Sequence, residues 1–164
     1  MMNTLKERIL TIIEKNSRID AGELAIMLGT EKPEIESALA ELEEEGIICG
    51  YHTMINWDST GVEKVTALIE VRVTPQRGKG FDDIAERIYK YPEVNTVYLM
   101  SGGYDLRVTI EGDSLKDVAL FVSEKLSTLE GVRSTKTNFV LKKYKENDVV
   151  YVEDERDRRE GIQA

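Results

Sequence analysis

Apolar residues recur at helical spacing in three short segments at the start of the chain. The first segment begins near Thr4. The second follows Asp20 and ends at Gly29, and the third contains Pro33 in its first turn and ends at Gly46. Aspartate is a favoured N-cap, proline suits a first helical turn, and glycine commonly ends a helix. The apolar faces are Leu5, Ile9, Ile12 and Ile13; Leu24, Ala25, Met27 and Leu28; and Ile35, Ala38, Leu39 and Leu42. The pattern predicts three helices joined by short turns.

Two short, partly β-branched runs follow the third predicted helix. Residues 47–51 and 53–56 have the composition of a small two-stranded wing. Three helices with a tight turn before the third, followed by a wing, are typical of a winged helix-turn-helix domain. We therefore predict such a domain over residues 1–57. A generic three-helix bundle with the same apolar faces is the alternative.

Beyond a polar, turn-rich linker at residues 58–64 the periodicity changes. Alternating or β-branched runs predict strands, and apolar residues at helical spacing predict helices between them. The predicted order is strand 66–73, helix 81–88, strands 94–100 and 106–111 in a hairpin bent at Gly102-Gly103, helix 115–126, and strand 132–141. This order is that of a ferredoxin-like βαββαβ sandwich over residues 65–145, so the predicted fold class is α+β. The charged tail, residues 146–164, has little pattern, and we expect it to be mobile or ordered only by a partner chain.

Composition narrows the class of protein. Hydrophobic residues make up 41% and charged residues 32% of the 164 positions, as in globular proteins. No apolar run approaches the roughly 20 residues that span a bilayer, and the N-terminus lacks a signal-peptide pattern. A cytoplasmic protein without membrane contact is expected. Cys49 is the one cysteine and His52 the one histidine, too few for a metal site, so we expect no metal and no cofactor.

The net charge of −9 argues against a strong nucleic-acid binder, because basic side chains supply most non-specific affinity for phosphates. Residues 1–57 hold five basic and eleven acidic side chains, a net charge of −6. Lys32 is the only cation from Glu31 to Gly46, which contains the third predicted helix. A solvated acidic helix face and weak or conditional DNA binding both fit this pattern.

Three segments, in this order, carry a resemblance to a known family. They are NSRID at residues 16–20, EEEGIICGY at residues 43–51, and SGGYD at residues 101–105. The chain resembles the Lrp/AsnC family of transcriptional regulators from about residue 4 to residue 145. The resemblance implies a homodimer formed through the sheet domains, often assembled into tetramers or octamers. It also implies an amino acid or similar metabolite bound between sensing domains, and a third helix in the major groove of double-stranded DNA.

Six residues are candidates for DNA contact. A glutamate in a recognition helix can accept a hydrogen bond from cytosine, and His52 lies where a wing would reach a phosphate. An ordinary surface histidine is the alternative for His52. The candidates are Arg18, Thr30, Lys32, Glu34, Ser37 and His52.

The Gly102-Gly103 turn is the candidate ligand site. Backbone N–H groups of a glycine-rich turn can approach a carboxylate closely. Asp105 would then accept a hydrogen bond from the ammonium group of an amino acid, and Tyr104 would pack against the side chain of that amino acid. A tight hairpin with Tyr104 packed at an interface is the alternative. The full candidate set is Ser101, Gly102, Gly103, Tyr104 and Asp105, with Thr135 and Thr137 on the last strand as weaker members.

Three functions compete. The first is a transcriptional regulator that responds to an amino acid. The second is an oligomeric ligand-binding or scaffold protein whose acidic third helix has lost independent DNA binding. The third is an enzyme, because sirohaem decarboxylases resemble the same two-domain architecture. A single histidine, in the predicted wing, and the absence of phosphate-loop or nucleophile motifs favour a protein that is not an enzyme.

Overall fold

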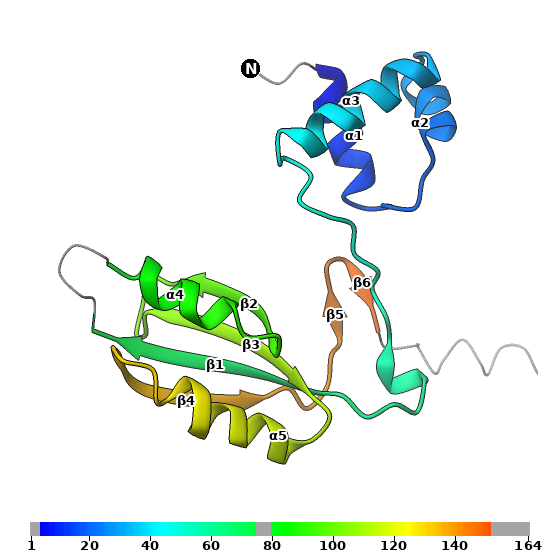
Figure 1. The fold of residues 1–164 in the computed structure, drawn as a ribbon. Coiled ribbons are helices and arrows are strands. Elements are labelled where there is room, and N and C mark those ends of the chain that lie inside the picture. Colours follow the sequence, from blue (N-terminus) through cyan, green and yellow to red (C-terminus); the bar gives the residue numbers. More distant parts are fainter. Residues whose placement is uncertain (1–3, 75–79, 152–164) are drawn as a thin grey trace, which may run out of the picture. The chain divides into compact units, whose positions relative to one another are not determined.

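The chain divides into two compact units, with the boundary between Met54 and Ile55. The computed structural model describes residues 4–74 and 80–151 (Figure 1). Most of the predicted charged tail, residues 152–164, lies outside the described residues. Each unit has its own apolar core, and each is described separately below.

The head contains the three predicted helices, α1 (Thr4–Ile13), α2 (Ala21–Leu28) and α3 (Lys32–Glu44). The Asp20 carboxylate caps α2 by accepting from the N–H groups of Gly22 at 2.7 Å and Glu23 at 2.9 Å. The Glu23 side chain accepts from the Asp20 N–H in return, which completes a capping box. Gly29 ends α2 in the left-handed conformation at φ 68°, which costs glycine little.

The apolar stripes of the three helices meet in the head core. Ile9, Leu24, Ile35 and Leu42 are fully buried there. Burying side chains of this size stabilises a fold by about 1.5–3 kcal/mol each before the entropy of folding is counted. The three predicted helices are therefore confirmed, and so are the Asp20 cap and the Gly29 end of α2.

The prediction of a two-stranded wing is wrong, because neither of the two runs forms a strand. Gly46 turns the chain at φ 68°, and the N–H groups of Ile47 and Ile48 both donate to the Leu42 carbonyl. Residues 49–56 then continue without forming a strand. β-branched composition favours extended backbone, but a strand needs a partner whose N–H and C=O groups complete the ladder. No described segment of the chain provides one here.

The second unit contains a four-stranded antiparallel sheet in the order β2-β3-β1-β4. Its strands are β1 (Val65–Val73), β2 (Val94–Leu99), β3 (Leu106–Gly112) and β4 (Val132–Phe139). The predicted hairpin is present, with Leu99 opposite Leu106. β1 lies between β3 and β4, as the ferredoxin-like βαββαβ order requires. The predicted fold class is confirmed.

Helices cover one face of this sheet. They are α4 (Asp82–Tyr89) and α5 (Leu115–Leu120), and α5 continues as a π-helix over Phe121–Leu126. Every second residue of β1 and β3 faces them, so Ile69 and Val108 are fully buried. The alternate residues, such as Leu68, face the other side, which no described helix covers.

The start of the tail is ordered within a single chain, contrary to our expectation. β5 (Lys145–Glu146) and β6 (Val149–Val150) form a short hairpin. Asn147 and Asp148 turn it with φ values of 45° and 65°. Positive φ at both central residues is the type I′ arrangement that joins tightly paired strands, and Asn and Asp tolerate it well.

Candidate functional site

Four of the six candidates for DNA contact lie together on the turn before α3 and on its first two turns. The Thr30 hydroxyl donates to the Glu34 carboxylate, and the Ser37 hydroxyl donates to Glu41 at 3.3 Å. Lys32 pairs with Glu36 at 3.4 Å, one helical turn on. Arg18 and His52 lie outside the helices and join none of these contacts: the Arg18 N–H donates to the Asn16 side chain, and the His52 ring lies beside the Thr53 carbonyl.

Several glutamates of α3 have partners within the head. Lys6 of α1 reaches across to Glu41 at 3.0 Å and to Glu45 at 3.2 Å. Its hydrogen bond to Glu41 is the main cause that raises the pKa of Lys6 and lowers the pKa of Glu41. The Tyr51 hydroxyl donates to Glu43 at 2.7 Å, and this bond raises the tyrosine pKa. Lys6 thus neutralises part of the negative charge at the end of α3, and Tyr51 adds a neutral hydrogen bond there.

The outer face of α3 is uncharged over its first turns and acidic at its end. Ile35, Ala38 and Leu42 turn inward, which leaves Pro33, Ser37, Ala40 and, at the end of the helix, Glu44 exposed on the opposite side. Pro33, Ser37 and Ala40 are small and uncharged. A helix with such a face can approach base edges closely, although it offers few cations for phosphates.

The 101–105 loop closes the β2–β3 hairpin at one end of the sheet. The Met100 N–H donates to the Asp105 carbonyl at 2.8 Å. Within the described chain the N–H groups of Gly102 and Gly103 donate to no backbone carbonyl. Neither glycine has a positive φ, and a Cβ added at either would meet no atom within 4 Å. The fold of one chain therefore does not require glycine at these positions.

Asp105 has a structural role that the sequence did not indicate. Its N–H donates to the Val71 carbonyl at 3.0 Å, and its carboxylate accepts from the Val73 N–H at 2.8 Å. The register of β1 against β4 shifts between Arg72 and Val73, and the carboxylate satisfies the Val73 N–H at this shift. One oxygen of Asp105 thus already accepts one hydrogen bond, and the carboxylate keeps further lone pairs for the predicted contact to a ligand ammonium.

Thr135 and Thr137 lie on β4, opposite Val71 and Ile69 of β1. They point toward the helix-covered face, and the Thr135 hydroxyl lies 3.1 Å from the Ser127 hydroxyl. Because Asp105 bonds to Val71 from the β3 side, Asp105 and Thr135 flank the same part of β1. Two strand spacings separate them, roughly 10 Å.

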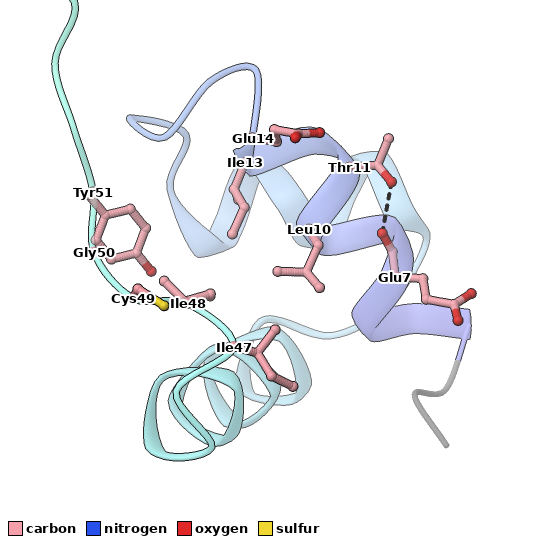
Figure 2. A pocket seen from close by; sticks show the side chains of 10 residues that line it. All are labelled: Glu7, Leu10, Thr11, Ile13, Glu14, Ile47, Ile48, Cys49, Gly50 and Tyr51. Carbon is pink, nitrogen blue, oxygen red and sulfur yellow. Dashed lines mark hydrogen bonds between the residues drawn. The ribbon is translucent and has the colours of Figure 1, made fainter. Parts of the chain in front are cut away.

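The sequence did not predict a groove in the head. The groove has a volume of about 450 Å³ and lies between α1 and residues 47–51, which follow α3. Figure 2 shows Leu10 and Ile13 pointing across it toward Ile47 and Ile48. Cys49 also lines it, and its thiol donates to the Gly46 carbonyl at 3.2 Å. Among the described residues no group of three or more metal-ligating side chains occurs.

A smaller hollow, of about 230 Å³, lies where β3 meets α5 in the second unit. Glu93 and Lys125 form an ion pair at its wall, and the hydrogen bond from Lys125 lowers the pKa of Glu93. The Lys125 ammonium also lies 5.7 Å from the ring centroids of Tyr91 and Phe121. This cluster joins the start of β2 to the π-helix.

Three helices that include a helix-turn-helix, followed by a ferredoxin-like sheet, define a two-domain protein with a helical head and a sheet domain. A model of winged helix-turn-helix DNA-binding domains matches residues 2–48, and a model of the Lrp/AsnC ligand binding domain matches residues 66–150. The chain belongs to the Lrp/AsnC family of transcriptional regulators, which confirms the resemblance. It combines a helix-turn-helix with a ligand-binding domain. No described helix is long and apolar enough to cross a membrane.

Named relatives agree with this assignment. An uncharacterised HTH-type transcriptional regulator of Bacillus subtilis, YugG, is 51% identical over 161 residues, covering 97% of each chain. A proline dehydrogenase transcriptional activator of Rhodobacter capsulatus is 30% identical over 82% of this chain and 87% of its own. A Neisseria meningitidis regulator solved as an L-Met complex shares the fold, with a TM-score of 0.72 at 23% identity over 89% of this chain and 94% of its own.

Proposed function

We propose that this cytoplasmic chain regulates transcription as a homodimer or larger assembly, in response to an amino acid or related metabolite bound at the 101–105 loop. Gly102 and Gly103 carry the proposal. Their backbone requires no glycine and their surroundings leave a side chain ample space, yet both residues lack one. The absence of side chains at both positions would let a ligand or a second copy of the chain approach the backbone closely.

The chemistry of the loop suits a ligand with an α-amino carboxylate. The N–H groups of Gly102 and Gly103 are available to a carboxylate, since they donate to no backbone carbonyl in the described chain. Tyr104 and Asp105 are half-buried beside them. The L-Met complex of the Neisseria regulator is consistent with this class of ligand.

The helix-free face of the sheet supports assembly of the chain with itself. Tyr98 is 55% exposed, and its partner in the register is Arg107, on the same face as Leu68. Exposed aromatic and apolar side chains on a sheet face favour contact with a second surface. A second copy would bury this face, and higher assembly to a tetramer or octamer would bring 101–105 loops from different chains together.

In the head, α3 is the element we propose to enter the major groove. Thr30, Lys32, Glu34 and Ser37 would lie nearest the DNA, with Arg18 and His52 at the margins. Lys6 holds Glu41 and Glu45 toward α1, which reduces their repulsion of phosphates. A ligand that favours one assembly would shift the population of paired heads able to reach two half-sites.

Fluorescence anisotropy with the DNA upstream of the chain's own gene tests the proposal. The titration is run at low and physiological salt, with and without a pool of amino acids. Saturable, salt-sensitive binding that the pool changes supports it. Binding that the pool leaves unchanged at every salt concentration contradicts the ligand response.

The net charge of −6 in residues 1–57 favours a second candidate, an oligomeric ligand-binding or scaffold protein that does not bind DNA alone. It predicts no anisotropy change even at low salt, while amino acids still alter the exchange of the 101–105 amides. The two readouts therefore separate the two functions.

A further inference from the structure

We propose that the groove along α1 binds a basic amphipathic helix of a partner protein. The groove belongs to the head and is lined by α1 on one side and by residues 47–51 on the other (Figure 2). None of its residues belongs to the outer face of α3 or to the 101–105 loop. The inference concerns a protein contact and does not depend on ligand or DNA binding.

Apolar side chains line part of the groove, between polar ones, and the groove is open to solvent. Leu10 lies on α1 between its two ends, and Ile47 and Tyr51 are 42% and 53% exposed. Ile47 and Ile48 follow the end of α3, and no described strand covers them. Exposed branched side chains around a hollow of about 450 Å³ leave room for two or three apolar side chains from outside.

The rim is acidic on the α1 side. Glu7 and Glu14 both line the groove, both are exposed, and neither forms an ion pair within the described chain. No lysine or arginine lines the groove. The Thr11 hydroxyl between them is occupied, because it donates to the Glu7 carbonyl at 2.9 Å (Figure 2). The rim therefore complements a cationic partner and repels an acidic one.

The spacing of the two carboxylates selects a helical partner. Glu7 lies on α1, and Glu14 directly follows the last residue of α1, with its N–H still donating to the Leu10 carbonyl at 2.9 Å. The two are seven positions apart, which places them on the same side, about 10 Å apart along the axis at 1.5 Å per residue. A partner helix that lies along α1 repeats the same period, so basic residues seven positions apart reach both carboxylates. Apolar residues three and four positions after the first basic residue then face Leu10 and Ile47.

The test uses the full-length protein and a fluorescein-labelled synthetic amphipathic helix, with lysines seven positions apart and leucines between them. A matched peptide has glutamates in place of the lysines. Saturable one-to-one binding of the lysine peptide is expected by fluorescence anisotropy at physiological salt, with no binding of the glutamate peptide. The double variant Glu7→Gln/Glu14→Gln is expected to weaken binding about 5-fold or more, as two partly exposed ion pairs would.

The control variant Glu31→Gln/Glu44→Gln removes the same charge from exposed positions outside the groove. It should leave the affinity within about 2-fold, since distant exposed charges are screened. Equal loss in both double variants would mean that net charge alone attracts the peptide and would overturn the proposal. So would the absence of saturable binding. Ile47→Ser tests the floor: a changed oligomeric state of the protein alone would make the groove an interface between copies, which also refutes the proposal.

Discussion

Replacing Asp105 with alanine removes the acceptor that the Val73 N–H uses where β1 shifts register against β4. The bond is 2.8 Å long and partly buried, and its acceptor is a carboxylate. A hydrogen bond to a charged group contributes about 1.5–3 kcal/mol to stability, and an unsatisfied buried donor costs a similar amount. We expect Asp105→Ala to lower the free energy of unfolding of the sheet domain by about 2 kcal/mol. Asp105→Asn keeps an acceptor oxygen and should lose about half as much.

Amide hydrogen exchange measured by NMR gives the most direct readout. A loss of about 2 kcal/mol corresponds to roughly 30-fold faster exchange when exchange follows opening. The effect should centre on the N–H of Val73 and on the N–H of residue 105 itself, which donates to the Val71 carbonyl. Asp113→Ala is the control, because the Asp113 side chain is 88% exposed and pairs with Lys64 only at 3.7 Å. Unchanged protection of Val73 in Asp105→Ala, with amino-acid binding lost, would refute the structural role and restore a purely ligand-binding one.

Three further predictions concern other parts of the chain. Gly131 has φ 93°, and a Cβ added there would lie 2.7 Å from the Ile84 side chain. Gly131→Ala should therefore lower the thermal midpoint of unfolding clearly more than the control Gly61→Ala. Gly61 has a similar φ of 75°, but a Cβ added there meets no atom within 4 Å. Lys125 lowers the pKa of Glu93 below its usual value near 4.5, so their pairing stabilises the fold above that pH and is lost as the pH falls through the lower folded pKa. Glu93→Gln should therefore cost up to about 1 kcal/mol in urea unfolding at pH 7, and its cost should decrease steadily as the unfolding is repeated at increasingly acidic pH. Glu44→Lys adds a cation near the outer face of α3, and it should tighten DNA binding and steepen the dependence of log K on log salt by about one unit in anisotropy titrations, unless that face does not meet DNA.

The sequence predicted the elements whose boundaries depend on local chemistry. Asp20 and Gly29 set the ends of α2 through a capping box and a left-handed turn, both of which depend on neighbouring residues alone. Alternating and β-branched runs likewise predicted the strands β1 and β3. The same reasoning failed where strand formation depends on a distant pairing segment. Residues 49–56 have strand-like composition, but no described segment pairs with them.

The candidate sites show the same limit. The 101–105 loop was found from its glycines. The hydrogen bond between Asp105 and Val73 could not be predicted, because the two residues are 32 positions apart and the bond depends on a register shift between β1 and β4. The hairpin of β5 and β6 was missed because Asn147-Asp148 lacks the glycine that usually marks a type I′ turn. Counting charges along α3 likewise missed Lys6, which belongs to another helix.

The contacts of Lys6 bear on how recognition helices are exchanged between regulators. A chimera that transplants residues 32–45 into another head would carry Glu41 and Glu45 without the lysine that pairs with both. The recipient helix would then present two additional unpaired carboxylates, and its DNA affinity would fall for reasons unrelated to base recognition. The transferable module is therefore α3 together with Lys6 of α1.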